Sequence, residues 1–455
     1  MLGGAVVGGG SGVTSIFYNP AGISEVRQSN VTLNSSMFSV VYKTYENALG
    51  ENQELSQFTF EIMPRFVSYL YRSKKFIELS WEISLFNRES REVFMDGTYE
   101  SDAAKYGFEN GERYFGSYDY WEKYNDYYAG IGTSYEINDN WIVGLSSFVS
   151  VKDLRSYNNI SSAIFETDNF GWYDPTQRDL QAGWNSYKLV NFLDVRVLTK
   201  LGLKYRLNKE ISLGVTVSFP SFRVFSYASS KKIIESKGIK DEHGNPLPDK
   251  YHHESAQYVK AQFKDPFSIA VGVRRKPLAS KNIYSITIEW FAKINPYKAI
   301  DAERGKSIFG DQVYGTEFSN YYMGNRSVIN FAFGYKREVR ENFELLFGFK
   351  SDFFSYYLPD SFKKAHQNAN TFIKIGSDML HFSSGANFIF KKKFKINMGG
   401  SISYGRKTNN TQLVNFVDAQ WYDPETGLAL QGERKDDLTY RHIILGLYLG
   451  FSLDF

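Results

Sequence analysis

The sequence predicts an all-β fold, a 14-stranded antiparallel transmembrane β-barrel whose N-terminal segment forms a hatch or plug in the lumen. Three observations support this prediction. Apolar and polar residues alternate through many segments, short and long connections alternate between those segments, and aromatic residues make up 17% of the 455 residues. A β-barrel that contacts lipid needs only every second side chain to be apolar, so its mean hydropathy stays low.

The alternation is clearest in the last stretch, "RHIILGLYLGFSLDF", where every odd-numbered residue from Ile443 to Phe455 is apolar. The residues between them are mostly small or polar, for example Gly446, Gly450 and Ser452. Because successive side chains of a strand point to opposite faces, this segment has one apolar face and one polar face. The same pattern occurs in "FIELSWEISLF", "ISLGVTVSF", "YSITIEW" and "FELLFGFK".

We expect strands of this kind at 29–45, 56–72, 76–98, 125–137, 141–157, 186–206, 210–229, 253–275, 281–296, 324–338, 342–356, 378–391, 394–408 and 438–455. Short turns follow the even-numbered strands and long segments follow the odd-numbered ones. Outer-membrane barrels have short periplasmic turns and long external loops, so both termini are expected on the periplasmic side. The alternative is a soluble β-sandwich or β-solenoid.

Composition excludes several classes of function. The chain has 53 basic and 50 acidic residues and no cysteine, so neither a nucleic-acid surface, a disulfide nor a thiolate metal site is expected. The adjacent pair His252 and His253 lacks a metal-ligand spacing, and no G-x-S-x-G motif is present. We therefore expect no enzyme activity, no cofactor and no metal. No secretory signal precedes the first glycines, so a processed or incomplete N-terminus is expected.

The alternation also places charged side chains in the lumen. This set comprises Glu61, Arg65, Glu78, Glu82, Glu289, Glu344 and Lys350. Two interpretations remain open: a water-filled or plugged lumen that tolerates polar groups, or a polar path along the barrel.

Pro64 interrupts the second expected strand, "FEIMPRFVSY". Proline cannot donate a hydrogen bond to a strand ladder, so Pro64 predicts either a plain bulge in the wall or a local gap toward lipid.

The N-terminal residues 1–28 lie outside the predicted barrel, which spans 29–455. "LGGAVVGGGSG" is rich in glycine, which tolerates the backbone angles of a compact plug. Ile16, Phe17 and Tyr18 form an apolar group, and the Asn19-Pro20-Ala21-Gly22 sequence predicts a turn into the first strand.

The segment "LGGAVV…SIFYNPAGISEV" resembles the N-terminal signature of the FadL family, the outer-membrane transporters of long-chain fatty acids and hydrocarbons in Gram-negative bacteria. The resemblance implies that Asn19, Pro20 and Ala21 are the hatch motif, with Ile16, Phe17 and Tyr18 beside it. It also implies an outer-membrane location and a lateral opening at a kink in the third strand. The segment 76–86 has no proline or glycine to form that kink.

Two functions follow as hypotheses. The first is an outer-membrane channel for passive uptake of fatty-acid-like hydrophobic molecules through outer loops, a pocket above the hatch and a lateral wall opening. Its partners would be a hydrophobic ligand or lipid and the lipid of the outer membrane. The alternative is a barrel of the same fold acting as a subunit of an outer-membrane secretion or assembly complex with other proteins. The long loop expected at 114–128, which is rich in aromatic and charged residues, and the missing kink favour this alternative.

Overall fold

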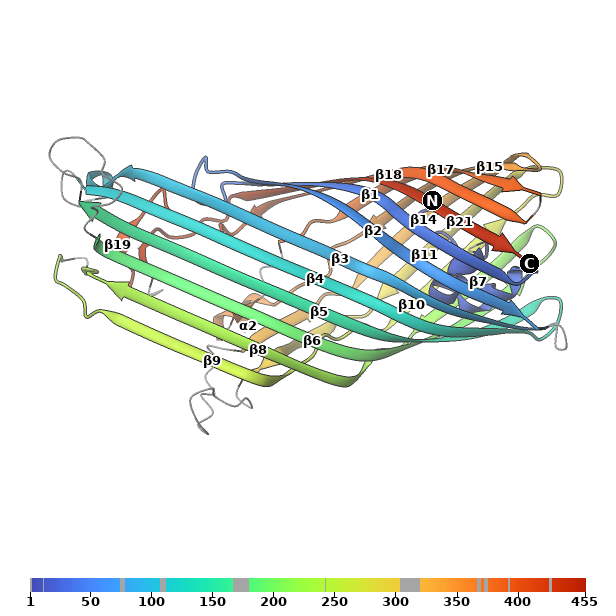
Figure 1. Ribbon diagram of the computed structural model, residues 1–455, viewed down its shortest axis with the longest axis horizontal. Helices are drawn as coiled ribbons and strands as arrows, with labels where there is room; N and C mark the ends of the chain where they lie inside the picture. Colours follow the sequence, from blue (N-terminus) through green and yellow to red (C-terminus); the bar gives the residue numbers. More distant parts are fainter. Residues whose placement is uncertain are drawn as a thin grey trace.

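The computed structural model describes residues 2–10, 12–73, 78–106, 112–166, 180–241, 243–302, 320–365, 370–371, 375–391, 393–424 and 428–455. They form a closed antiparallel β-barrel of 14 wall strands (Figure 1). The predicted fold class and the predicted strand number are therefore confirmed.

Ten wall strands are continuous, and four are each divided into two by a break. The continuous strands are β1 (Asn30–Glu46), β2 (Leu55–Arg72), β3 (Leu79–Asp102), β4 (Glu112–Glu136), β5 (Trp141–Glu166), β6 (Leu180–Arg206), β15 (Phe343–Asp352), β17 (Met379–Phe390), β18 (Phe394–Asn410) and β21 (Leu438–Asp454). The divided strands are β7 (Ile211–Ser218) with β8 (Phe222–Lys237), β9 (Lys250–Ala261) with β10 (Ser268–Arg275), β11 (Asn282–Phe291) with β12 (Ile294–Asp301), and β13 (Tyr321–Asn325) with β14 (Val328–Arg340).

The remaining elements are short. They are η1 (Gly12–Thr14), α1 (Ser15–Tyr18), η2 (Pro20–Glu25), η3 (Ala103–Tyr106), α2 (Asp360–Ala365), β16 (Asn370–Thr371), β19 (Gln420–Tyr422) and β20 (Ala429–Gln431). No helix in the described part of the chain is long and apolar enough to span a bilayer.

The first and last wall strands close the barrel. β1 pairs with β21 from Asn30–Asp454 to Glu46–Thr439. Closure removes the free edges that a sheet of this size would otherwise expose, and it pairs backbone groups that lipid could not solvate. The two faces of β21 differ as the alternation predicts, because Leu445, Leu447 and Leu453 are exposed outside while Gly450 and Ser452 are buried inside.

The segment 114–128, expected as a loop, is instead part of strand β4. Strands β3 to β6 are long and, together with β8 and β9, extend well beyond the other wall strands at one end of the barrel (Figure 1). Tyr114, Tyr118 and Tyr120 are buried on the inner face of this extension, in one hydrophobic cluster with Phe416 from the segment between β18 and β21. These tyrosines are separated by even numbers of residues because they lie on one face of a strand. The segment is therefore part of the barrel wall, and its inner face contributes to an aromatic core.

The four divided strands break at one height of the barrel. The residues next to the breaks in β7, β10, β11 and β14 pair directly with one another across the sheet. These pairs are Ser218–Ser268, Ser268–Phe291 and Phe291–Val328. Prolines lie at two of the breaks, Pro220 between β7 and β8 and Pro266 between β9 and β10. Because proline has no N–H to donate, the ladder is interrupted there and the chain can leave the wall.

We expect an arginine on the outer face of β21 to destabilise the barrel. Leu447 is 58% exposed on that face, and Leu447→Arg should lower the free energy of unfolding by about 2–4 kcal/mol, the cost of a cation near the bilayer midplane. The measurement is urea unfolding in lipid vesicles. The control is Ser383→Arg, since Ser383 on β17 points into the lumen and should change stability far less. Equal losses for the two variants would contradict the assignment of faces.

Candidate functional site

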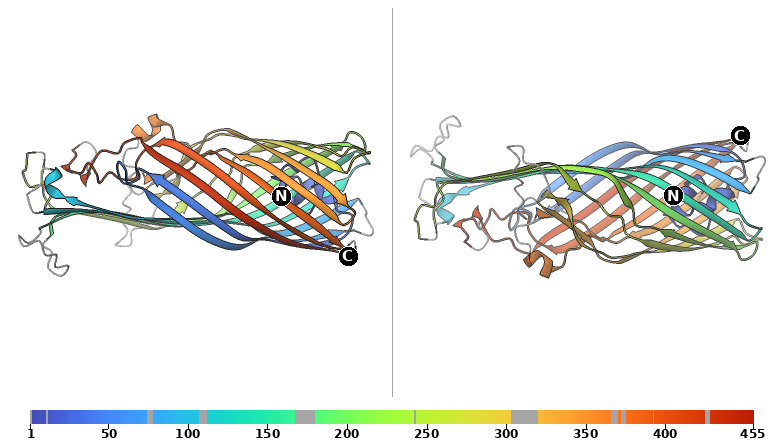
Figure 2. Two further views of the ribbon diagram at one scale, coloured as in Figure 1. Left: turned by 90° about the horizontal axis from the view of Figure 1, so that it is seen from above. Right: turned by 90° about the horizontal axis from the view of Figure 1, so that it is seen from below.

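The N-terminal segment lies inside the barrel at the end that carries the short turns and the C-terminus (Figures 1 and 2). Its turn is organised by Asn19, whose side-chain oxygen accepts a hydrogen bond from the N–H of Ala21 at 3.1 Å and caps η2. Pro20 occupies the first helical position, where its missing N–H costs nothing. The amide nitrogen of Asn19 donates to Val7 O at 2.8 Å and to Leu203 O of the wall at 3.2 Å. One side chain thus joins the turn, the glycine-rich run and strand β6.

Inward-facing glycines make room for this segment. A Cβ at Gly144 or Gly202 would overlap the Asn19–Ala21 turn, and a Cβ at Gly214 would overlap the carbonyl oxygen of Val7. Further glycines of the same kind, each beside the N-terminal segment, are Gly132, Gly272 and Gly334. We did not predict these positions, although a signal was present in the repeated sequences "IVGLS", "KLGLK", "SLGVT", "AVGVR" and "AFGYK".

Polar contacts complete the attachment on the same side of the lumen. Ser24 and Ser134 share a hydrogen bond of 2.7 Å, and the Ser212 hydroxyl donates to Gly8 O at 2.7 Å. Lys204 of β6 forms an ion pair with Glu25. These contacts come from β4, β6 and β7. The Val7 N–H also donates to Thr287 Oγ1 of β11 at 3.4 Å, and Arg72 of β2 donates to Ser24 O at 3.1 Å, so the N-terminal segment is attached to strands from β2 to β11.

An aromatic cluster lies beside α1. The ring of Phe17 contacts those of Phe86, Tyr128 and Phe148 with centroids 5.4, 6.2 and 6.1 Å apart. Ile16 and Ile23 are fully buried in the same group, and Phe66 packs against it. The cluster is a packed apolar group inside the lumen in which Phe17 and Phe66 remain partly exposed, and it reaches the wall at β2 and β3.

The wall is interrupted where this cluster meets it. Among the described residues, ladder pairing between β2 and β3 runs from Phe66–Phe86 to Arg72–Ser80 and stops there. Pro64 lies two residues beyond, at a register shift between β1 and β2. Beyond this point, side-chain hydrogen bonds take the place of the ladder between β2 and β3. For example, the Lys43 side chain of β1 donates to Glu92 O of β3 at 3.0 Å.

The segment 76–86 shows no kink in its described residues, 78–86, which agrees with its lack of proline and glycine. The irregularity comes directly after it, because the register of β3 against β4 shifts between Asn87 and Glu89. A bulge of this kind needs no proline or glycine, so sequence composition could not reveal it.

A buried ionic cluster lies above the aromatic cluster, where the break between β9 and β10 brings Asp265 into the lumen. Asp265 pairs with Lys152 at 3.0 Å and with Arg88 at 3.3 Å, and it accepts a hydrogen bond from Ser221 at 2.6 Å. Three cations and three carboxylates meet here and balance in charge: Arg88, Lys152, Arg196, Asp126, Asp194 and Asp265. The cluster ties the broken strand to β3, β4, β5 and β6.

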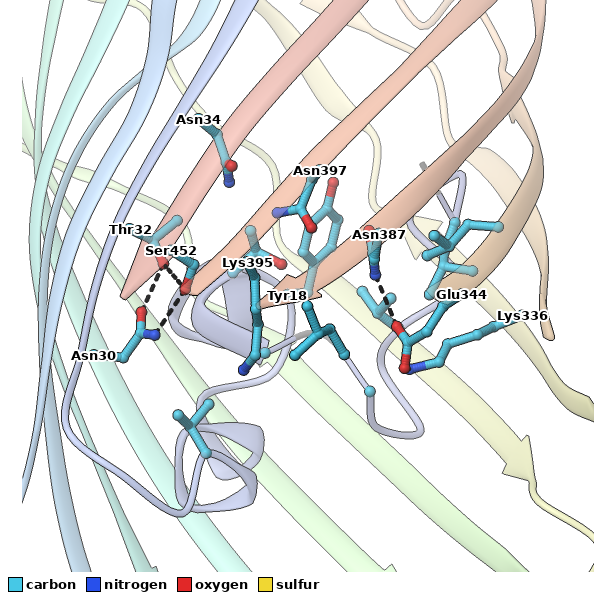
Figure 3. Close-up of a pocket in the computed structure, with 18 of the residues that line it drawn as sticks. Tyr18, Asn30, Thr32, Asn34, Lys336, Glu344, Asn387, Lys395, Asn397 and Ser452 are labelled. Atoms are coloured by element: carbon cyan, nitrogen blue, oxygen red, sulfur yellow. Dashed lines mark hydrogen bonds and ion pairs between the residues drawn. The ribbon is translucent and has the colours of Figure 1, made fainter. Parts of the chain in front are cut away.

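The opposite side of the lumen holds a polar cavity of about 510 Å³ (Figure 3). Its wall is formed by β1, β14, β15, β17, β18 and β21, and its inner boundary is the N-terminal segment with Tyr18. Its charges are paired, Lys336 with Glu344 at 2.6 Å and Lys395 with Asp454 at 2.7 Å. The rest of the polar lining consists mainly of asparagine, serine and threonine side chains.

The residues predicted to face the lumen differ in their burial and in their partners. Glu82 is fully buried, near Ile16 of the N-terminal segment, and Glu289 accepts a hydrogen bond from Ser268 at 2.9 Å. Glu344 lies in the polar cavity, Lys350 pairs with Asp352 at 3.8 Å, and Glu61 is partly buried. Glu78 is exposed in the turn before β3, because the strand begins only at Leu79. The side chain of Arg65 lies outside the described residues.

Comparison with solved structures shows that the chain has the fold of FadL-type transport barrels. No protein-family model and no curated protein sequence matches the chain. Among solved structures, the chain is similar to the toluene transporter TodX of Pseudomonas putida, with a TM-score of 0.56 and 14% identity over 100% of this chain and 99% of that one.

The toluene transporter TbuX of Ralstonia pickettii has a TM-score of 0.55 and 12% identity, covering 100% of this chain and 96% of that one. A FadL homologue of Pseudomonas aeruginosa has a TM-score of 0.55 and 12% identity, covering 97% and 94%. The resemblance stated from the sequence is therefore confirmed for the fold.

The glycine contacts predict that one added methyl group will displace the N-terminal segment. Gly214→Ala should speed amide hydrogen exchange in residues 2–25 at least tenfold, because its Cβ has no space beside Val7. The measurement is hydrogen-exchange mass spectrometry. Gly400→Ala is the matched control, since its Cβ would meet other atoms only at ordinary contact distance, 3.4 Å or more. Unchanged exchange in Gly214→Ala would contradict the close packing.

Removing Asp265 should destabilise the barrel. Asp265→Ala leaves Lys152, which is 1% exposed, with one carboxylate fewer, and breaking a buried ionic cluster costs about 3–5 kcal/mol. Urea unfolding measures this loss. Asp418→Ala removes a surface carboxylate paired with Lys435 and should cost about 0–1 kcal/mol. A loss no larger than that of the control would show that the cluster contributes little.

Proposed function

We propose that this protein is an outer-membrane channel for the passive uptake of hydrophobic small molecules. The observation that carries the proposal is the aromatic cluster around Phe17, which reaches the wall where β2 and β3 stop pairing. An apolar surface stabilises an apolar solute by roughly 25 cal/mol per Å² removed from water. A solute held there would lie beside an interrupted stretch of wall.

The proposed route is lateral. Beyond Phe66 and Phe86 the two strands are joined by side chains of β1 and β2 that donate to Glu92 O, in place of a continuous ladder. Opening these contacts removes the side-chain donors of one carbonyl, Glu92 O, which costs less than breaking a run of ladder hydrogen bonds. The solute would leave the barrel between β2 and β3 into the outer leaflet or core of the membrane.

The N-terminal segment is proposed to act as the hatch of this channel. Ile16 and Phe17 would form the floor of the ligand pocket, with Tyr18 beside them, and Asn19, Pro20 and Ala21 would hold the floor against the wall. Residues 1–28 would then be a separate functional unit within the barrel 29–455. Both termini would face the periplasm, on the side of the short turns.

The class of ligand is supported by the comparisons. TodX and TbuX are described as toluene transporters, and a third similar structure is a FadL homologue. We extend this chemistry to the present chain as uptake of monoaromatic hydrocarbons or fatty-acid-like molecules.

A charge placed in the route should stop uptake. Phe66→Arg puts a guanidinium at the edge of the aromatic cluster, and uptake of labelled toluene or of a labelled long-chain fatty acid into proteoliposomes should fall at least tenfold. Ser383→Arg introduces the same group on the far side of the lumen and should leave uptake unchanged. Comparing the two solutes identifies the preferred ligand. Wild-type vesicles that take up neither solute faster than protein-free vesicles would reject the proposal.

A second function is favoured by one observation. Tyr251 and Tyr258 on β9 are 69% and 79% exposed, on a strand that pairs with β12 only at its end among the described residues. Such an edge suits a protein partner, as in an outer-membrane secretion or assembly complex. Purification from membranes in mild detergent followed by mass spectrometry distinguishes the two functions, because a stoichiometric set of other proteins would favour the complex.

A further inference from the structure

The lumen is divided into two unlike halves, and the second half has no role in the hydrophobic route. The N-terminal segment is attached to β4, β6 and β7, and it fits against glycines of β4, β5, β6, β7, β10 and β14. On the opposite side it leaves the polar cavity of about 510 Å³. That volume is many times what a single water molecule needs.

The lining of this cavity matches small uncharged solutes. Each cation near it has an acid partner, Lys336 with Glu344 and Lys395 with Asp454, so no unpaired charge selects for an ion. Asn34 and Asn397 project amide groups into the cavity (Figure 3), and neither amide has a side-chain hydrogen-bond partner among the described residues. A free amide offers both donors and an acceptor, which suits hydroxyl groups.

Tyr18 lies at the inner boundary of this cavity. Its side chain projects from the N-terminal segment into the cavity (Figure 3), and the residue remains 37% exposed. Further along the lumen, Lys350 is within electrostatic range of Tyr18 and of Arg88, and the side chains of Lys350 and Arg88 are 43% and 36% exposed. Tyr18 is therefore close both to the cavity and to charged side chains further along the lumen.

We propose that this half of the lumen is a polar passage to the periplasmic side for small uncharged hydroxyl-bearing solutes, and that the Tyr18 side chain controls its width. Asn34 and Asn397 exchange hydrogen bonds with the solute as it passes. The passage is separate from the route between β2 and β3 and does not depend on it.

The test measures swelling of proteoliposomes in arabinose, a small neutral sugar. Tyr18→Ala should raise the swelling rate at least threefold over wild type. The chain has no cysteine, so Asn397→Cys in the Tyr18→Ala background provides a single thiol. Its modification by the water-soluble sulfonatoethyl methanethiosulfonate should reverse at least half of that increase.

Met398→Cys in the same background is the matched control, because Met398 is the next residue of β18 and points outward, 46% exposed. Treatment of this variant with the reagent should leave the swelling rate unchanged. Heat-modifiable migration on gels confirms that each variant is folded.

The proposal is overturned if folded Tyr18→Ala vesicles swell no faster than wild type, or if complete modification of Cys at position 397 leaves the rate unaltered. Toluene uptake measured in wild-type vesicles keeps the two proposals apart, because Tyr18 lies beside the proposed ligand pocket. Retained toluene uptake without arabinose swelling rejects the polar passage alone, and the reverse result rejects the hydrophobic route alone.

Discussion

The structure depends on one constraint: backbone N–H and C=O groups inside a bilayer must find partners within the protein. The pairing of β1 with β21 satisfies this constraint by closing the sheet. Once the wall is closed, each backbone group that lacks a strand partner needs another hydrogen-bond partner. Side chains can supply it, or the chain can turn into the lumen. The departures at Phe66 and at Asp265 are compensated in these two ways, which is why they mark the places where the interior is organised.

The strands of the wall could be predicted because their side chains alternate regularly between two environments. A strand with lipid on one side and a wet interior on the other must alternate, and the segment from Ile443 to Phe455 shows the alternation without a tertiary model. The even number of strands and the order of short and long connections followed from the same pattern. The boundaries of β4 could not be predicted, because Tyr114 to Tyr128 alternate against an inner core formed partly by Phe416, nearly three hundred residues away in sequence.

The site was less predictable, because it arises from contacts between distant residues. The Asn19-Pro20-Ala21 turn was visible as a motif, yet its partners Gly144, Gly202 and Leu203 are defined only once β5 and β6 lie beside it. The ionic cluster was invisible for the same reason: Asp265 falls within the single strand expected at 253–275, and the break between β9 and β10 that turns it inward was not predicted. Polar residues on a predicted lumen face indicate a wet interior, and they do not reveal which of them will be buried.

The glycines explain why the lumen is asymmetric. A plug that packs its backbone directly against the wall requires wall residues without side chains, and this chain places such glycines on β4, β5, β6, β7, β10 and β14. Strands β17, β18 and β21 instead present Asn387, Asn397 and Ser452 to the polar cavity at the corresponding end of the barrel. The polar cavity lies between the N-terminal segment and strands β1, β17, β18 and β21, so its position follows from where that segment packs closely against the wall.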